Sequence, residues 1–455
     1  METYFLKHED ISKFYGCINE DFKLYVPFKV SVPARIKCDY GFNLPSDDYL
    51  LKSYSALKEG EVCFNEYRCL EPTARAFFTY FKEEVCEYFQ DKTETRTGKK
   101  AMAISGVKNC DLFAAKIQDF VFLEGVEEDS LYKERRQNTL IISSDCPNFK
   151  ETCFCRAFQI NPYAQDGFDF NLSPITNGYL VDIATKRAKL IVGSLKNIFI
   201  PASVGQLSAR SVKRDAVVKR MEEHLAHHKI PKKENLKEIV LSGYNSALWQ
   251  EQMKTCVECG GCIFICDTCH CFLLSDELKS ETVKRLRVWD GCLLKNFSRV
   301  AGGANPLKLR YQRLRNRYLK KFDFFVDNLG YQACCGCGRC IDVCPGKIDI
   351  RHILRKLYEE KYLPASKAII EDVIQETPTI KTFVLRPKVD FSFQTGQFIE
   401  LTVPGIGEGP FTPSSNPGIR EKFEVTIVNA GRVTAQLHQM AKGQSLGFRG
   451  PYGKG

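Results

Sequence analysis

Two cysteine runs with identical spacing constrain this chain more than any other feature. The pattern C-x2-C-x2-C-x3-C occurs at Cys256, Cys259, Cys262 and Cys266, and again at Cys334, Cys337, Cys340 and Cys344. Three thiolates at this spacing let one tight loop reach three corners of an iron–sulfur cubane, while the fourth reaches the other cluster. The pattern therefore predicts two [4Fe-4S] clusters with crossed ligation. One set is Cys256, Cys259, Cys262 and Cys344, and the other is Cys334, Cys337, Cys340 and Cys266.

The main alternative for these runs is zinc. Structural zinc sites usually take two C-x2-C pairs separated by a longer loop, which does not describe four cysteines in eleven residues. Asp267 stands where proline often follows the fourth cysteine, and Cys335 adds a thiol inside the second run, but neither removes a ligand. Further thiols, at Cys269, Cys271 and Cys292, fit ligation and a structural role equally well, so they stay unassigned.

Composition supports metal or redox chemistry. The chain has 455 residues, enough for about three domains, and 21 cysteines. Its N-terminus lacks an apolar signal core, and no apolar stretch is long enough to span a membrane, so we expect a cytoplasmic protein without a membrane span. In that reducing compartment the cysteines should not mainly form disulfides. Two clusters would lower the formal net charge of +10 to roughly +6, and three to roughly +4.

The chain is predicted to be a multidomain α+β protein. Residues 1–250 are expected to form an α/β domain, with strands in AMAISGV and NTLIISSDC and a helix in CDLFAAKIQDFVF. Residues 176–193 resemble a hairpin, and 207–254 have a helical period. Residues 251–360 form the predicted ferredoxin-like dicluster domain. Residues 361–455 are rich in β-branched strands typical of a small antiparallel barrel, although SKAIIEDVIQ has a brief helical period.

Seven Lys or Arg residues in the predicted helix 305–321 leave three readings open. The basic face can be solvated or compensate cluster charge, dock a partner protein, or bind nucleic acid. No aromatic stacking platform accompanies it, so we expect no nucleic-acid partner.

A third cysteine group lies in the α/β domain, at Cys110, Cys146, Cys153 and Cys155. Four thiols are the number that a cubane needs, which predicts a third [4Fe-4S] cluster. The alternative is ordinary buried cysteine, a common core residue.

The strings CVECGGCIFICDTCHCF, RVWDGC, AGGANPLKLRYQRLRNRYLKKF and CCGCGRCIDVCPGKIDI resemble the beta subunit of cytoplasmic sulfhydrogenases and the A subunit of anaerobic sulfite reductases. SGVKNCDLFAAKIQDFVFL, YKERRQ and CFCRAF extend the resemblance upstream, so it covers about residues 100–355. It implies a protein that carries electrons between a flavoprotein module and a catalytic subunit.

The strings GQFIELTVPG, GPFTPSSNP, KFEVTIVNAGRVTAQLHQMAKGQSL and RGPYGKG resemble the FAD-binding barrel of the ferredoxin–NADP reductase superfamily, particularly sulfhydrogenase gamma subunits. The resemblance implies FAD, with contacts from Phe411, Thr412, Ser414, Ser415, Gly431, Val433, Thr434 and Gly450. Gly409 stands where the family has an arginine for the pyrophosphate, so the start of the helix after NAGRVT must contribute more. The alternative is that the barrel binds no flavin and serves only as a docking platform.

The expected function is that of an iron–sulfur flavoprotein electron-transfer subunit. It would pass electrons between FAD or NAD(P)H chemistry and a catalytic partner such as a hydrogenase, a sulfite or sulfur reductase, or a related anaerobic oxidoreductase. The sequence contains no G-x-G-x-x-G motif, so we expect a separate or missing NAD(P)-binding domain. The alternatives are a freestanding iron–sulfur enzyme that uses the CDTCHC segment with His270, and a nucleic-acid-binding iron–sulfur protein.

Overall fold

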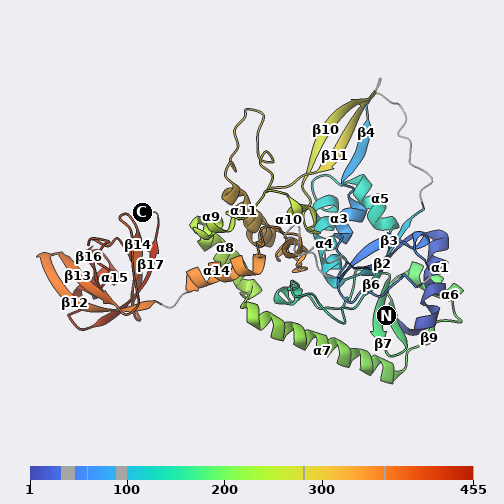
Figure 1. Cartoon of the computed structure of the whole chain (residues 1–455), viewed down its shortest axis with the longest axis horizontal. Helices are drawn as coiled ribbons and strands as arrows, with labels where there is room; N and C mark the ends of the chain where they lie inside the picture. The colour runs from blue at the N-terminus through green and yellow to red at the C-terminus, as the bar shows by residue number, and fades with distance from the viewer. Residues whose placement is uncertain (32–46, 59, 89–99, 280–281, 363–364, 454–455) are drawn as a thin grey trace. The chain divides into compact units, whose positions relative to one another are not determined.

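The computed structural model divides the chain into two compact units, Met1–Tyr358 and Glu359–Gly455. It describes residues 1–31, 47–58, 60–88, 100–279, 282–362 and 365–453 (Figure 1). The predicted boundary between residues 250 and 251 falls inside the first unit, where one apolar core joins residues from both sides of it. The division of this unit into two domains stays a prediction.

The first unit contains a mixed eight-stranded sheet in the order β3-β2-β5-β6-β7-β8-β1-β9. Its strands are β1 (Glu2–Lys7), β2 (Lys23–Ser31), β3 (Asp47–Ser53), β5 (Met102–Val107), β6 (Leu140–Ser144), β7 (Phe170–Ile175), β8 (Gly178–Ile183) and β9 (Ile200–Pro201). The neighbours from β2 to β7 pair in parallel, and the remaining pairs are antiparallel. The predicted strands β5 and β6 are confirmed, and both are largely buried, as parallel strands usually are.

Helices of this unit include the predicted α4. Their bounds are α1 (Ile11–Asp21), α3 (Thr73–Phe78), α4 (Asn109–Leu123), α5 (Ser130–Asn138), α6 (Lys186–Ser194) and α7 (Val204–His228). The long α7, prominent in Figure 1, contacts β7 and β8 and confirms the predicted helical connector.

The hairpin interpretation of residues 176–193 was wrong for its second half. The hairpin consists of β7 and β8, with Asn177 at a positive φ of 64° in the turn. The following residues form α6, because the Thr185 hydroxyl caps the helix by accepting a hydrogen bond from Ala188 N. Ala188 and Val192 then bury one face of α6.

The cysteine segment consists of short helices and loops beside a three-stranded antiparallel sheet. That sheet has β10 (Phe272–Lys279), β11 (Thr282–Trp289) and β4 (Lys82–Glu87). The helices are α8 (Leu236–Ser242), α9 (Leu248–Gln252), α10 (Gly261–Phe264), α11 (Arg310–Leu319), a π-helical turn (Lys320–Phe324), α12 (Phe325–Leu329), α13 (Arg339–Asp342) and α14 (Ile350–Tyr362). The basic segment is thus a helix as predicted.

The second unit is a six-stranded antiparallel sheet in the order β15-β14-β17-β12-β13-β16. Its elements are β12 (Ser366–Thr377), β13 (Ile380–Pro387), β14 (Phe398–Val403), β15 (Gly407–Phe411), β16 (Phe423–Val428), α15 (Arg432–Gln439) and β17 (Ser445–Tyr452). The helical period of SKAIIEDVIQ was misleading, since these residues belong to β12. Pairing with β13 and β17 stabilises the β-branched residues there as a strand.

No helix among the described residues combines the length and the apolar character that crossing a membrane requires.

Candidate iron–sulfur and flavin sites

The first predicted cysteine set gathers around one cavity. Cys256, Cys259, Cys262 and Cys344 all line it, although Cys344 is far away in sequence, and Cys340 of the second set lines it too. Contact between α10 and α13 brings the two runs together. Backbone N–H groups already face two of the sulfurs: Glu258 N lies 3.5 Å from Cys256 Sγ, and Ile348 N lies 3.4 Å from Cys344 Sγ. The last cysteine of the second run thus lies with the first three of the first run, and the assignment of ligands stays a prediction.

The second predicted set is more deeply buried. Cys266 interacts electrostatically with Cys334, Cys337 and Cys340, so the last cysteine of the first run faces the second run. Burial raises the pKa of the Cys334 thiol to about 12 and that of Cys340 to about 11. Thiolates at these positions therefore need cations beside them, and the iron ions of a bound cluster would supply positive charge directly at the sulfurs.

The basic helix supplies two of these cations. Arg317 and Lys321 are each only 5% exposed. Lys321 Nζ lies 3.3 Å from Cys266 Sγ, and Arg317 donates a hydrogen bond to the Cys262 carbonyl oxygen at 3.3 Å. Burial alone would lower the pKa of Arg317, but neighbouring thiols such as Cys262 raise it well above its usual value. These contacts favour the cluster-compensating reading of the basic helix.

Unpartnered buried N–H groups provide a test of whether an anionic cluster fits. Arg317 Nε is buried and has no hydrogen-bond partner among the described residues. It belongs to a side chain that interacts with thiols of both sets, including Cys262 and Cys340. A buried donor without an acceptor is costly, and cluster sulfurs offer acceptors. The donor set and the unpartnered Arg317 Nε fit [4Fe-4S] clusters.

Two thiols outside the ligand pattern contact ligand sulfurs. A hydrogen bond from Cys335 lowers the pKa of Cys337 to about 6, and one from Cys269 holds the pKa of Cys266 well below its usual value. Cys271 and Cys292 line a small cavity beside Cys269. Cys269 and Cys335 are thus placed to donate S–H hydrogen bonds to ligand sulfurs.

The four cysteines of the N-terminal group also converge. Cys155 interacts electrostatically with Cys153 and Cys146, and Cys110 interacts with Cys155. Burial raises the pKa of all four thiols, that of Cys146 to about 12. The group therefore also needs compensating charge if its sulfurs are thiolates.

Glycines hold this group against the second cysteine run. Phe154 N donates to the Gly336 carbonyl oxygen at 2.8 Å, and Gly336 has a positive φ of 64°. A Cβ on Gly336 would lie 2.5 Å from Cys155 Cα, closer than any side chain tolerates. The loop of Cys153 and Cys155 therefore packs directly on the loop of Cys334 and Cys337.

Two fully buried arginines stand between these loops. Arg339 forms an ion pair with Asp111 at 2.7 Å, and Arg68 forms one with Asp342 and donates to the Cys337 carbonyl oxygen at 2.8 Å. Each keeps one buried nitrogen, Arg339 Nη2 and Arg68 Nη1, without a partner among the described residues. The same argument from orphaned donors applies here, which favours an anionic occupant next to Cys337 and Cys153.

In the second unit, Phe411 and Val433 come together as the flavin resemblance implies. Both lie near Gly409: a Cβ built there would be 3.2 Å from the Phe411 ring and 3.9 Å from Val433. Ser414 and Ser415 lie on the next loop and bond to β16, since Ser414 shares a hydrogen bond with Thr426 and Ser415 accepts one from Glu424 N.

The remaining flavin candidates are at the surface. Thr412, Ser414, Gly431 and Gly450 are exposed. The Thr434 hydroxyl accepts hydrogen bonds from Ala430 N at 2.9 Å and Gly431 N at 2.8 Å. The hydroxyl therefore occupies two backbone N–H donors at the start of α15 that a phosphate could otherwise use. Arg432, exposed in the first turn of α15, is a cation placed where a phosphate is expected.

Comparison with known proteins matches both regions to domain families. Residues 255–348 match the 4Fe-4S dicluster domain family, and residues 368–455 match the oxidoreductase FAD-binding domain family. Sulfhydrogenase 2 subunit beta of Pyrococcus furiosus is 32% identical over 286 residues, which covers 62% of this chain and 80% of that protein. The chain belongs to the sulfhydrogenase beta subunit family.

The C-terminal barrel has relatives of a second kind. Sulfhydrogenase 1 subunit gamma of Pyrococcus furiosus is 42% identical over 84 residues, 17% of this chain and 29% of that protein. A probable dihydroorotate dehydrogenase B electron transfer subunit of Methanocaldococcus jannaschii is 39% identical over 84 residues, 18% of this chain and 30% of that protein. The chain thus spans under a third of these relatives. It combines a beta subunit that carries two [4Fe-4S] clusters with an FAD-binding domain, the composition of an electron-transfer flavoprotein subunit.

Two buried arginines beside the candidate cluster sites were not predicted from the sequence. Arg68 belongs to the first hundred residues, where no motif marks it. Arg339 lies inside the second cysteine run, and that position alone was a signal that it faces a cluster.

Proposed function

We propose that this chain relays electrons between FAD in its second unit and a catalytic partner subunit, through clusters held in its first unit. The observation that carries the proposal is the set of buried thiols beside buried arginines, each with one unpartnered nitrogen among the described residues, in a chain that also has an FAD-binding domain. FAD, when bound, exchanges two electrons with nicotinamide as hydride and one at a time with iron–sulfur centres.

We assign the ligands of the paired clusters as the crossed sets, Cys256, Cys259, Cys262 and Cys344 in one, and Cys334, Cys337, Cys340 and Cys266 in the other. Lining of one cavity by the first set and mutual interaction within the second support the assignment. Arg317 and Lys321 then offset the cluster charge and donate to the sulfurs.

We also propose a third [4Fe-4S] cluster at Cys110, Cys146, Cys153 and Cys155. Their convergence and the orphaned nitrogens of Arg68 and Arg339 support it. Because this group packs on the loop of Cys337, it would extend the relay into the α/β domain.

In the second unit, we propose that Phe411 and Val433 contact the flavin ring and that Thr412, Ser414 and Ser415 line its edge. The start of α15, with Gly431, Thr434 and the exposed Arg432, would take the pyrophosphate in place of the missing arginine at Gly409, and Gly450 would close the site.

The relatives named above suggest partners. A hydrogenase-type catalytic subunit is the proposed acceptor or donor, with sulfur or sulfite reduction as the other terminal reactions. We propose that nicotinamide binds outside these 455 residues, that the protein works in the cytoplasm, and that nucleic acid is not a partner. Burial of Arg313, Arg317 and Lys321 supports the last point, because these cations are turned into the protein.

The test is electron transfer within the anaerobically isolated protein. The flavin is reduced by light and a deazaflavin, and the visible absorption of flavin and clusters is followed. We expect reoxidation of the flavin to match bleaching of the clusters, and electron paramagnetic resonance to detect reduced [4Fe-4S] centres. A flavin that stays reduced beside oxidised clusters would contradict the relay.

A further inference from the structure

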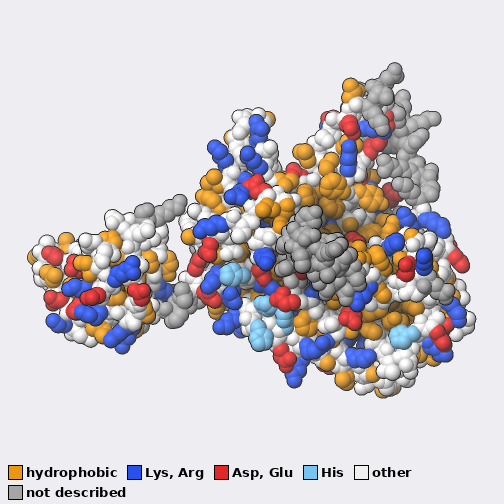
Figure 2. Space-filling model, in the orientation of Figure 1, with side chains coloured by type: hydrophobic (Ala, Val, Ile, Leu, Met, Phe, Trp, Pro, Cys, Tyr) orange, Lys and Arg blue, Asp and Glu red, His pale blue; other side chains and the backbone are white. Residues whose placement is uncertain are grey.

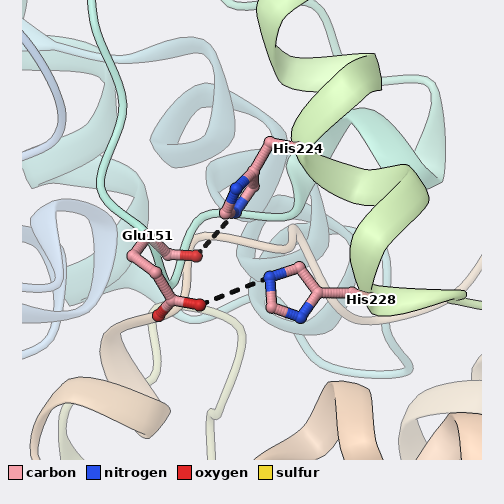
Figure 3. A group of neighbouring side chains, drawn as sticks. All are labelled: Glu151, His224 and His228. Carbon is pink, nitrogen blue, oxygen red and sulfur yellow. Dashed lines mark hydrogen bonds and ion pairs between the residues drawn. The ribbon is translucent and has the colours of Figure 1, made fainter.

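Outside the cysteine and flavin sites, the described residues hold one group of metal-ligating side chains. His224 and His228 lie one turn apart near the end of α7, and Glu151 faces them from the loop that leads to Cys153. One ring nitrogen of each histidine and one carboxylate oxygen of Glu151 lie within 4.8 Å of one another (Figure 3). Histidine side chains reach the surface where α7 ends, so a cation can enter from solvent (Figure 2).

The contacts within this group hold its members in place. His224 Nε2 donates a hydrogen bond to the Glu151 carbonyl oxygen at 2.8 Å. His228 Nε2 lies 3.3 Å from Glu151 Oε1, and Arg351 holds both of these acceptor atoms by donating to each. The ring of Phe149 packs 5.3 Å from the ring of His224. A bond from a histidine ring to a backbone carbonyl is the contact that usually orients metal-binding histidines.

The Arg351 guanidinium already contacts two of these three residues, His228 and Glu151. Arg351 Nη1 donates to His228 Nε2 at 3.0 Å, and Arg351 Nη2 donates to Glu151 Oε1 at 3.1 Å. Because a guanidinium only donates, His228 presents a lone pair in this arrangement. Arg351 keeps a second carboxylate, Asp349, at 2.7 Å. Its charge therefore stays paired if its contact with Glu151 and His228 is lost.

We propose that Glu151, His224 and His228 bind a divalent cation of the zinc type, which takes the place of the Arg351 contact. Two histidines spaced H-x3-H on one helix and a carboxylate form a donor set that suits Zn²⁺, with a fourth position left to water. This nitrogen and oxygen site is chemically distinct from the sulfur sites.

The site would act as a clamp. Glu151 lies two residues before Cys153, and α7 contacts the short helix Cys155–Phe158. A bound cation would tie the loop of Cys153 and Cys155 to α7. Binding of the cation itself does not depend on the proposed third cluster, so the two proposals fail separately.

The experiment uses the anaerobic holoprotein of 455 residues, incubated with equimolar ZnSO₄ and desalted. Zinc is counted by mass spectrometry, and its ligands are identified by X-ray absorption at the zinc edge. We expect about one zinc with only nitrogen and oxygen neighbours. In the double variant His224→Ala/His228→Ala we expect zinc affinity to fall roughly 10-fold or more.

The matched control is His227→Ala, which removes an exposed histidine on the same helix and should keep the zinc. Iron content and cluster absorption report folding in every variant. Equal zinc in the double variant, sulfur neighbours at the zinc edge, or no retained zinc in the parent protein would each overturn the proposal.

Discussion

The cluster region and the flavin barrel hold their predicted site residues in opposite ways. Around the clusters, Cys334 and Cys337 and three thiols of the N-terminal group are buried, and Arg68, Arg317 and Arg339 are buried beside them. In the barrel, Thr412, Ser414 and Gly431 are exposed. A buried anionic site needs its compensating charges built in, because water cannot supply them. A surface site can use solvent and the ligand's own groups, so fewer of its contacts are predetermined.

We expect the largest effect from Cys344→Ala, which tests the buried side of this comparison. This change should remove the cluster that Cys256, Cys259 and Cys262 hold, which is about four irons of the roughly eight in the paired clusters. Iron analysis and electron paramagnetic resonance of the anaerobic protein measure it. Cys86→Ala is the control, since Cys86 is an exposed cysteine of β4 outside the ligand sets. Loss of the Cys334 centre instead would show that the ligation is not crossed.

A similar loss is expected from Cys155→Ala if the N-terminal group holds a cluster. Iron should fall from about twelve to about eight per chain, while the signals of the paired clusters persist. Cys69→Ala removes a buried thiol outside the groups and serves as the control. Equal iron in both variants would mean that the N-terminal group is ordinary buried cysteine.

A smaller effect should follow from Arg317→Gln. Removing a buried cation disfavours the more negative, reduced state of a cluster, so its reduction potential should fall. A charged hydrogen bond is worth about 1.5–3 kcal/mol, which corresponds to about 60–130 mV. A redox titration followed by electron paramagnetic resonance measures the change. Arg315→Gln is the control, because Arg315 lies against Tyr244 instead. An unchanged potential would contradict the compensating role of the basic helix.

The smallest effect concerns the barrel, where Gly409→Arg restores the cation that related barrels have. We expect FAD to bind roughly 10-fold more tightly, the worth of one charge-assisted hydrogen bond. Fluorescence titration of the apoprotein with FAD measures the affinity. Gly409→Ala separates the steric cost, since its Cβ would lie 3.2 Å from the Phe411 ring. If Gly409→Arg binds FAD no more tightly than Gly409→Ala, the pyrophosphate does not lie beside residue 409.

Much of the cluster region could be predicted because its chemistry is local in sequence. The spacing of the two cysteine runs was sufficient to predict the dicluster domain, and strand and helix patterns near β5, α4 and β6 were read correctly. The errors, in residues 176–193 and in SKAIIEDVIQ, arose where a short apolar period is compatible with either a helix or a strand. A capping threonine decided the first case, and pairing with β13 and β17 decided the second.

The sequence by itself determined which residues can hold iron, because ligand type and spacing are properties of a short loop. Only the tertiary structure decided what surrounds them. Arg68 reaches Cys337 across 269 residues, and Gly336 allows the loop of Cys155 to approach the second run. Such contacts depend on burial and on packing between distant segments, and neither produces a periodic pattern in the sequence. That is why the ligand sets could be written from the spacing, and the cations beside them only from the fold.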